Sequence, residues 1–313
     1  MKRLCLKVDV DTHDGMRDGV PRLVELCGRA KVPATFFLSF GPDNAGKAIF
    51  NLLRPGFLKK MLRTSAPSMY GMRTVLSGTL LPARPIATKF PEIVRAAEKA
   101  GHEIGVHAWD HRRWQDHVWK MEPAEISQHF ERSFEAFEKI LGHRPAGIAA
   151  PAWAVTAQSL ALQDQLGLVY ASDLRGGPIC LLSAGGKALK TPQIPTTGRC
   201  IEELLAAGVS DENAILDAIL GDLGSADPAV LAVHAEVEGG PYAALFEKLL
   251  ARVQHSGVEI VTLESVARSL ERSQLPRREL AHVELPGRAG QVSSSAPAGV
   301  PALTVSISSA SSV

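Results

Sequence analysis

The sequence lacks several features that would point to other classes of protein. It has no run of about 18 uninterrupted apolar residues, so a membrane-spanning helix is not expected. Its formal net charge is only +1, so we expect no general attraction to nucleic acid and no nucleic-acid partner. The four cysteines are scattered without a CxxC spacing. This argues against a zinc ribbon and a dense disulfide scaffold, and favours free buried thiols.

Three regions stand apart in composition. At the N-terminus, MKRLCLKVDVD reaches Asp9 before an apolar stretch of signal-peptide length develops, which favours a cytoplasmic protein. Residues 44–91 contain no Asp or Glu but interleave Lys and Arg with Leu, Phe and Met. Such a basic amphipathic insertion suits either a membrane surface or packing on the domain, and the sequence leaves both open. Residues 273–313 are rich in Ser, Ala, Pro and Gly, and are predicted to be a disordered tail after a catalytic domain over 1–272.

The apolar pattern predicts strands and helices in alternation. Strand-like segments at 4–10, 34–40 and 102–107 are separated by helical segments, and a long amphipathic helix is predicted at about 122–141. This order is typical of parallel strands with crossover helices, in an open sheet or a barrel. Polar side chains fall at or just past the strand ends, where (β/α) barrels assemble their active sites. We therefore expect an α/β fold of the barrel type, with parallel strands and outer helices.

GVHAWDH at 105–111 is the strongest local signal. The four-residue spacing of His107 and His111 predicts two imidazoles on one side of a helical turn, as in two-histidine metal sites. Such a pair is more often an ordinary core or surface pair, so by itself it is weak evidence for a metal.

The VDVD segment supplies carboxylates. Asp9 and Asp11 are separated by one residue, so both side chains point to the same side of an extended strand. Two anions this close call for a nearby cation. Asp11 with the two histidines gives a two-nitrogen, one-oxygen ligand set with open positions, and Asp9 is left to accept a proton from water. The alternative is a pair of aspartates capping the turn at 12–15.

A late histidine completes the candidate set. His234 follows an apolar strand, from which it could protonate a leaving amine. Asp173 could orient that imidazole as the carboxylate of a triad does, and Glu236 and Glu238 could line the same pocket. Each of these residues also has a structural explanation when taken singly.

Together the motifs resemble those of the polysaccharide deacetylase family: VDVD, HAWDH, APAW at 150–153, SDLRG at 172–176 and VHAE at 233–236, in that order. The resemblance implies a deformed (β/α) barrel and one divalent metal ion that acts in hydrolysing an amide on an amino sugar. It makes Asp9 the base, His234 the acid and Asp173 its orienting partner. It makes the metal ligands Asp11, His107 and His111. This ligand set accepts Zn, Mn, Co or Ni.

Further phrases, such as GPDNAG at 41–46, QIPTT at 193–197 and HAEVEG at 234–239, resemble family members that act on a lipid-linked formamide. This implies an undecaprenyl-phosphate-linked sugar as substrate, at the cytoplasmic face of the bacterial inner membrane, in lipid A modification. Residues 44–91 would then bind the membrane surface peripherally. The candidates for the substrate pocket are Trp109, Trp153, Tyr170, Arg175 and Glu236.

One departure from the family pattern concerns an arginine of the third motif. Ala149 and Ala154 occupy its expected positions, and that arginine normally orients the base. Either Arg175 substitutes for it or activity is weakened. Alternative functions are therefore an N-deacetylase of another amino sugar and a non-catalytic metal-binding homologue. A non-haem iron oxygenase is a third, although its close HxD spacing is absent.

Overall fold

The computed structural model describes residues 2–47, 77–79, 81–224, 226–285 and 290–297. Most of the basic insertion predicted at 44–91 therefore lies outside the described residues. No helix within these ranges is long and apolar enough to cross a membrane. The four cysteines are free and buried, as predicted.

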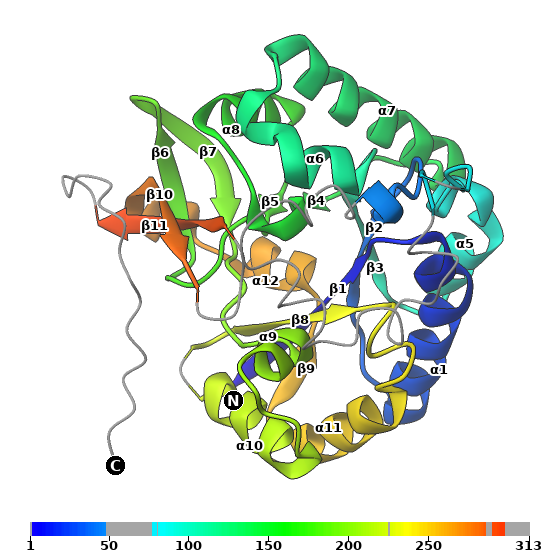
Figure 1. The fold of residues 1–313 in the computed structure, drawn as a ribbon. Helices are drawn as coiled ribbons and strands as arrows, with labels where there is room; N and C mark the ends of the chain where they lie inside the picture. Colours follow the sequence, from blue (N-terminus) through cyan, green and yellow to red (C-terminus); the bar gives the residue numbers. More distant parts are fainter. Residues whose placement is uncertain (1, 48–76, 80, 225, 286–289, 298–313) are drawn as a thin grey trace.

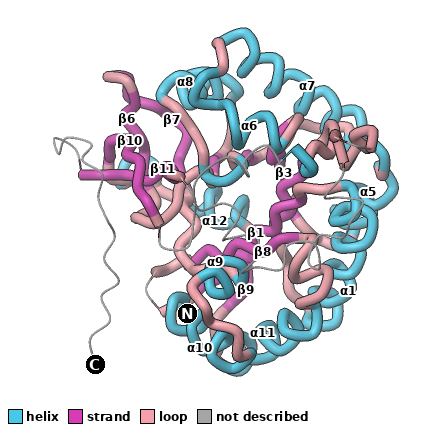
Figure 2. The backbone as a smooth tube through the Cα atoms, viewed as in Figure 1, coloured by secondary structure: helices cyan, strands magenta, loops and turns pink. Residues whose placement is uncertain are grey.

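Parallel strands form the centre of the molecule and helices surround them (Figures 1 and 2). The strands are β1 (Arg3–Val10), β2 (Thr35–Ser39), β3 (Glu103–Ala108), β4 (Gly147–Ile148), β5 (Tyr170–Ala171), β6 (Cys180–Ala184), β7 (Lys187–Gln193), β8 (Ala229–His234), β9 (Glu259–Val261), β10 (Arg277–Glu284) and β11 (Gln291–Pro297). The helices are α1 (Val20–Ala30), α5 (Pro91–Lys99), α6 (His111–His117), α7 (Pro123–Leu141), α8 (Ala157–Gln163), α9 (Ile201–Ala206), α10 (Glu212–Leu223), α11 (Ala243–His255) and α12 (Leu263–Ser269).

The parallel part of the sheet runs in the order β5-β4-β3-β2-β1-β8. In the part of the chain that the structure describes, no regular strand joins β8 to β5. Instead, the chain after β7 runs beside β5 and reaches β8 through a single bridge between Gly198 and Leu231. The prediction of a deformed barrel with parallel strands and outer helices is confirmed. The barrel is deformed because irregular chain, in place of a regular strand, lies between β5 and β8.

Buried apolar residues hold the outer helices against the central strands. β1 is buried along nearly its whole length, as expected of a central parallel strand covered on both faces. Helices α1, α5, α7 and α11 turn apolar stripes toward it, in one continuous core. Two of these helices end with a left-handed residue, Lys31 after α1 and Gly142 after α7, a common way to satisfy the last carbonyls.

The prediction that residues 273–313 form a disordered tail is wrong for the described part of that segment. β10 and β11 form an antiparallel hairpin, and β10 also pairs with β6. Val283 and Val292 are buried against Trp153, Cys200 and Ala232. The composition misled because serines are frequent in β11, yet the two strands pair with each other, β10 pairs with β6, and two valines supply the buried face. Residues 298–313 lie outside the described residues.

Candidate active site

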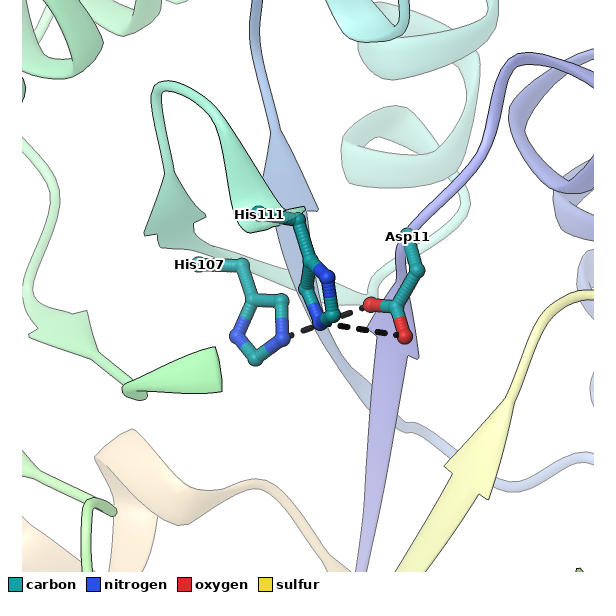
Figure 3. Close-up of side chains that lie close together, drawn as sticks. All are labelled: Asp11, His107 and His111. Atoms are coloured by element: carbon teal, nitrogen blue, oxygen red, sulfur yellow. Dashed lines mark ion pairs between the residues drawn. The ribbon is translucent and has the colours of Figure 1, made fainter. Parts of the chain in front are cut away.

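The ends of β1 and β3 bring the predicted metal ligands together (Figure 3). His107 Nε2 lies 3.3 Å from Asp11 Oδ1, and His111 Nε2 lies 3.3 Å from Asp11 Oδ2. The candidate ligand atoms of all three residues lie within 4.8 Å of one another. Ligands about 2.0–2.2 Å from a tetrahedral ion are about 3.3–3.6 Å apart by geometry. The spacing therefore fits a divalent cation shared by the three side chains.

The spacing of the two histidines had predicted that they share a helical turn. The structure shows that they do not. His107 belongs to β3, and His111 is the first residue of α6. The chain turns at Asp110, whose side chain accepts the Arg113 N–H and so caps α6. The sharp strand-to-helix turn, rather than helical periodicity, brings the imidazoles to ring centroids 5.1 Å apart.

Hydrogen bonding sets His107 up as a ligand. Its Nδ1 lies 2.7 Å from the Ala149 carbonyl, to which it donates. The Nε2 lone pair is then left to face Asp11, the arrangement found when a metal-binding imidazole is oriented by a carbonyl behind it. Asp11 Oδ1 is buried and makes no hydrogen bond. A buried anionic oxygen without a donor is an observation that a cation at this point explains.

The protonation states of Asp11 and His111 suit a cation, whereas Asp9 and Asp11 outweigh the effect of burial on His107 and raise its pKa. Burial by itself raises the pKa of Asp11, but His111 and His107 outweigh it and hold that pKa well below its ordinary value. Burial lowers the pKa of His111 to about 4. Near neutral pH the carboxylate is therefore charged and this imidazole is neutral, the forms in which each offers lone pairs to a metal.

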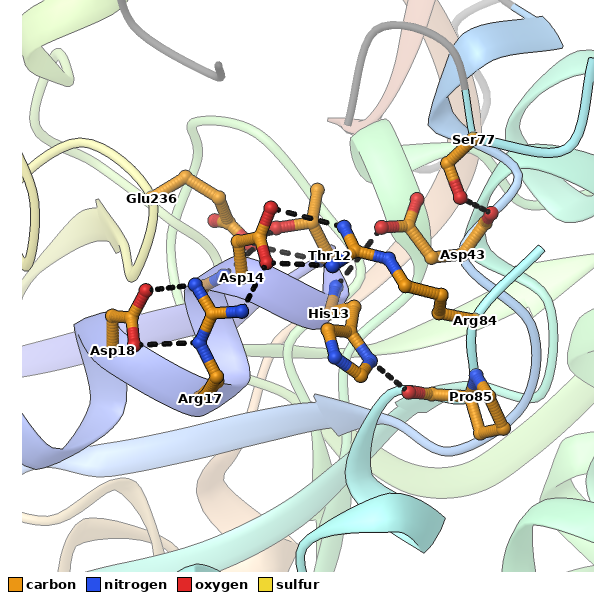
Figure 4. A network of polar contacts seen from close by, with 11 residues as sticks. Thr12, His13, Asp14, Arg17, Asp18, Asp43, Ser77, Arg84, Pro85 and Glu236 are labelled. Carbon is orange, nitrogen blue, oxygen red and sulfur yellow. Dashed lines mark hydrogen bonds and ion pairs between the residues drawn. The ribbon is translucent and has the colours of Figure 1, made fainter. Parts of the chain in front are cut away.

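The loop after β1 that carries Asp11 is held from two sides (Figure 4). On one side, Glu236 Oε1 accepts the N–H groups of Asp11 and Thr12, at 3.0 and 2.7 Å, and the Thr12 hydroxyl at 2.8 Å. A side chain at Gly15 would collide with Glu236, because a Cβ there would lie 2.1 Å from Oε1. Glu236 therefore fixes the ligand loop, a role that its prediction as a substrate-binding residue did not include.

On the other side, residues around Arg84 hold the same loop. Arg84 donates both terminal nitrogens to Asp14, each at 2.9 Å. The His13 N–H donates to Asp43, and His13 Nδ1 donates to the Pro85 carbonyl. The segment before β3 is thus tied to the loop of the metal ligands (Figure 4).

The candidate base and the candidate acid lie side by side on neighbouring strands. Asp9 on β1 and His234 on β8 are register partners in the parallel pair, so both side chains point to the same side of the sheet at the same level. Asp9 is buried and its Oδ1 makes no hydrogen bond. Both residues therefore lie at the mouth of the barrel beside the three ligands.

His234 is paired with Glu202 rather than with Asp173, which corrects the predicted partner. Its Nδ1 lies 3.0 Å from Glu202 Oε1, at the start of α9. Burial by itself lowers the pKa of His234, but the Glu202 carboxylate outweighs it and raises that pKa well above its ordinary value. Sequence reasoning missed Glu202, because IEELL reads as an ordinary helix start. The only available signal was the acidic pair Glu202 and Glu203 in the first helical turn.

Asp173 instead organises the buried interior. Its carboxylate accepts the Ala150 N–H and the side-chain amides of Gln163 and Gln193. Burial raises its pKa, and the hydrogen bonds partly offset this. Its position fixes the loop that carries Trp153, in which Ala152 and Trp153 both have left-handed backbone, with φ of 53° and 51°. Strain of this kind in non-glycine residues is concentrated at functional sites.

The remaining predicted pocket residues are distributed unevenly. Trp153 is buried, and its indole N–H donates to the Thr196 hydroxyl. Arg175 pairs with Glu203 at 2.8 Å, so it does not substitute for the missing arginine beside Asp9. Trp109 is half-buried beneath the Arg132 guanidinium. Tyr170 lies inside the barrel with its hydroxyl on Glu103, not at the mouth.

Glu238 fixes the backbone of the candidate acid, His234. Its Oε2 accepts the His234 backbone N–H at 2.7 Å. Burial raises its pKa to about 8, with Glu202 adding to the shift. Glu238 therefore fixes the backbone at the end of β8, as Glu236 fixes the loop after β1, and neither carboxylate stands free in a pocket.

Comparison with known proteins agrees with this geometry. Residues 10–171 match the model of the polysaccharide deacetylase family. The chain is 37% identical over 93% of its length to the "Probable 4-deoxy-4-formamido-L-arabinose-phosphoundecaprenol deformylase ArnD" of Shewanella sediminis, covering 94% of that protein. A protein of the same name from Wigglesworthia glossinidia brevipalpis is 29% identical, over 89% of this chain and 97% of the other.

Solved structures support the fold. A probable polysaccharide deacetylase from Pseudomonas aeruginosa PAO1 superposes with a TM-score of 0.59 at 18% identity, covering 87% of this chain and 92% of the other. The motifs, the barrel and the family match therefore converge, and the chain belongs to the polysaccharide deacetylase family.

Proposed function

We propose that this protein hydrolyses the formamide of undecaprenyl-phosphate-linked 4-deoxy-4-formamido-L-arabinose, releasing formate and the 4-amino sugar lipid. One observation carries the hydrolytic part: Asp9 and His234 are register partners beside a three-residue cation site. The family consists of hydrolases that act on amide bonds, and the relatives named as deformylases supply the substrate. Lipid A modification is the corresponding role.

The proposed reaction divides the work among a few groups. A divalent cation held by Asp11, His107 and His111 would supply a Lewis acid that polarises the formyl carbonyl and makes water more acidic. The Asp9 carboxylate accepts one proton from the attacking water. As the carbon–nitrogen bond breaks, His234 donates a proton to the departing amine. The water oxygen ends in formate, and the nitrogen leaves as the amino sugar.

The orientation of His234 follows from its partner. With Nδ1 facing Glu202, the other ring nitrogen is the one free to donate a proton. The negative charge of Glu202 also stabilises the protonated imidazole before the reaction. Glu202 is thus proposed to orient the acid.

Selectivity for a formyl group is proposed to come from a closely packed wall. Trp153 is fixed by Thr196, and Trp109 is packed against Gly41, where a Cβ would lie 2.5 Å from the Trp109 carbonyl oxygen. A formyl group is smaller than an acetyl group by one methyl, and one methyl in a closed pocket changes discrimination by about 10- to 200-fold. Arg175 is proposed to support this wall through its guanidinium, which lies 5.6 Å from the centre of the Trp153 ring, whereas Glu236 is proposed to act on the loop of Asp11.

The test is an assay of formate release from the formamido-arabinose lipid. Metal-stripped protein is reconstituted separately with Zn, Mn, Co and Ni, and the N-acetyl analogue is assayed in parallel. We expect turnover of the formamide that disappears in Asp9→Asn and His234→Ala. Asp18→Asn, which changes an exposed residue between β1 and α1, should retain it. No formate with any of the four ions would reject the substrate. Faster release of acetate would favour the N-deacetylase alternative.

We also propose that the enzyme works as a peripheral protein at the cytoplasmic face of the inner membrane, with residues 44–91 on the bilayer. The support is the sequence of that segment, basic and apolar without acidic residues, because cations meet lipid phosphates while apolar side chains enter the interface. Deletion of residues 48–76 should abolish co-sedimentation with anionic vesicles. Unchanged binding would reject this role for the segment.

A further inference from the structure

Lys7 is a fully buried cation inside the barrel. It lies on β1 two residues before Asp9, so both side chains point inward on the same side of the strand. None of the Lys7 side chain is exposed to solvent. Lysine is almost never buried to this extent unless its charge is paired.

The pairing partner is the candidate base. Lys7 Nζ lies 3.3 Å from Asp9 Oδ2, and within the described residues Nζ makes no hydrogen bond. Two aromatic rings enclose the ammonium, with Phe37 at 5.8 Å and Trp153 at 5.2 Å from ring centroid to Nζ. Rings of this kind attract a cation but cannot replace a counter-ion in a site closed to solvent. Within the described residues, Asp9 is the carboxylate in direct contact with the ammonium.

Two other charged groups in the interior have partners of their own, whereas the charge of Lys7 also reaches the buried Asp173 carboxylate and opposes the rise that burial causes in its pKa. Glu103, in the layer below, accepts hydrogen bonds from Tyr170, Thr35 and the Glu264 N–H. Arg175 contacts Glu203 and two carbonyls, and not Asp9. The positive charge beside Asp9 thus comes from its own strand, whereas Ala149 and Ala154 stand where the sequence comparison led us to expect an arginine.

We propose that Lys7 is the positioning residue for the base, holding the Asp9 carboxylate in one orientation through the contact between Nζ and Oδ2. The ammonium keeps the carboxylate in one rotamer and balances its charge next to Asp11. Lys7 touches neither the water nor the substrate, so it acts through Asp9. This inference rests on the proposed function, in which Asp9 is the base.

The kinetic test compares Lys7→Met, which keeps the length of the side chain and removes its charge, with Lys7→Arg, which keeps the charge. We expect Lys7→Met to lower kcat roughly 100-fold, the lower range for loss of acid–base assistance. KM and the Kd for the metal should stay within about twofold, because those sites are untouched. Lys7→Arg should recover most of the lost kcat. If Lys7 only filled space in the interior, Lys7→Met would keep more of the wild-type kcat than Lys7→Arg, since methionine suits an apolar interior better than arginine.

A matched control is Cys5→Ala. Cys5 lies two residues before Lys7 on the same strand and is equally buried, so this variant reports the effect of disturbing the interior without changing charge. It should lower the melting temperature and leave kcat within about twofold. A kcat for Lys7→Met within about twofold of wild type would overturn the proposal. So would a loss in Lys7→Arg as large as in Lys7→Met.

A measurement independent of substrate separates the two proposals. Urea midpoints are compared for the metal-loaded wild type, Lys7→Met, Asp9→Asn and the double variant. If the pair exists, each single variant strands a buried charge, and the double variant loses less stability than the sum of the two. Coupling without any turnover of the formamide would reject the substrate while the pair stands. Additive losses would overturn the pair whatever the activity.

Discussion

Glu202 Oε1 lies 3.0 Å from His234 Nδ1, so a carboxylate from the start of α9 sets the orientation and charge of an imidazole at the end of β8. The two residues are separated by the whole of α10 in the sequence. Because the contact brings a negative charge against the ring, it favours the protonated form that a general acid needs. The pH dependence of kcat should therefore change when Glu202 is substituted.

Glu202→Gln should move the alkaline limb of the kcat profile to lower pH. The carboxylate raises the pKa of His234, and an acid is active only below its pKa. Removing the charge lowers that pKa, so activity is lost at a lower pH than in the wild type. At pH 8 we expect kcat to fall roughly 10- to 100-fold.

The control for this prediction is Asp173→Asn. Asp173 was the partner expected from the sequence, but its carboxylate is bound by Ala150, Gln163 and Gln193. This variant should be less stable, with the alkaline limb unmoved. A shift of the limb in Asp173→Asn and none in Glu202→Gln would reverse the assignment of the orienting carboxylate.

Glu236→Ala should weaken metal binding although Glu236 is not among the ligands. Its Oε1 holds the backbone of Asp11 and Thr12, and outer contacts of this kind are worth about 10- to 100-fold in metal affinity. Isothermal titration of metal-stripped protein would measure the change in Kd. Asp18→Asn, on the exposed side of the same network, should bind metal like the wild type. An unchanged Kd in Glu236→Ala would remove its role in ordering the loop.

The success of sequence reasoning depended on whether the relevant contacts were local. The placement of Asp9 on β1 and of Asp11 just past its end at one site follows from the two-residue period of a strand, and this could be predicted. The proximity of His107 to His111 was also predicted, but through a helical turn that does not exist, since the bend at Asp110 produces it. Compact motifs therefore predicted that these side chains lie close together, even where the predicted local geometry was wrong.

Partners from distant segments could not be predicted in the same way. Glu202 reaches His234 because α9 follows the irregular segment that bridges to β8, and nothing in IEELL indicates this packing. Lys7 resembles an ordinary strand residue until Trp153 and Phe37 are seen to enclose it. The β10–β11 hairpin was missed because its stability comes from pairing with β6 and from two buried valines, rather than from an apolar composition.

Truncation after Leu275 should destabilise the protein and reduce its activity. The hairpin it removes bonds to the loops around the site: the Arg175 N–H donates to the Ser293 carbonyl, and the Val155 N–H to the Ser293 hydroxyl, at 2.8 and 3.0 Å. Val283 and Val292 also cover Trp153. The truncation removes both valines, and losing the stabilisation that their burial provides costs about 3–6 kcal/mol, which should appear as a lower melting temperature.

The control for the truncation ends the chain after residue 297, which keeps the whole hairpin. This variant should match the full-length protein in melting temperature and in formate release. Equal stability of the two truncations would show that the hairpin does not support the barrel.

The buried carboxyl of Glu103 should make stability fall as pH rises. Burial raises its pKa to about 7 from an ordinary value of 4.5, against the opposing effect of three hydrogen bonds. Below pH 4.5 the group is protonated in both the folded and unfolded states, so it contributes no pH dependence. Between pH 4.5 and 7 the folded state holds the proton more tightly, so the free energy of unfolding falls as pH rises and then levels off.

Glu103→Gln removes this titration while keeping the shape of the protonated side chain. Its free energy of unfolding should equal that of the wild type near pH 4.5 and exceed it by up to about 3 kcal/mol above pH 7, since each unit of pKa is worth about 1.4 kcal/mol. Urea unfolding of both proteins across this range measures the difference. Glu259→Gln, an exposed change on β9, should leave the wild-type slope in place. If Glu103→Gln kept that slope as well, the pH dependence would have to come from another buried acid, and Glu236 and Glu238, with pKa values of about 8, would be the next to substitute.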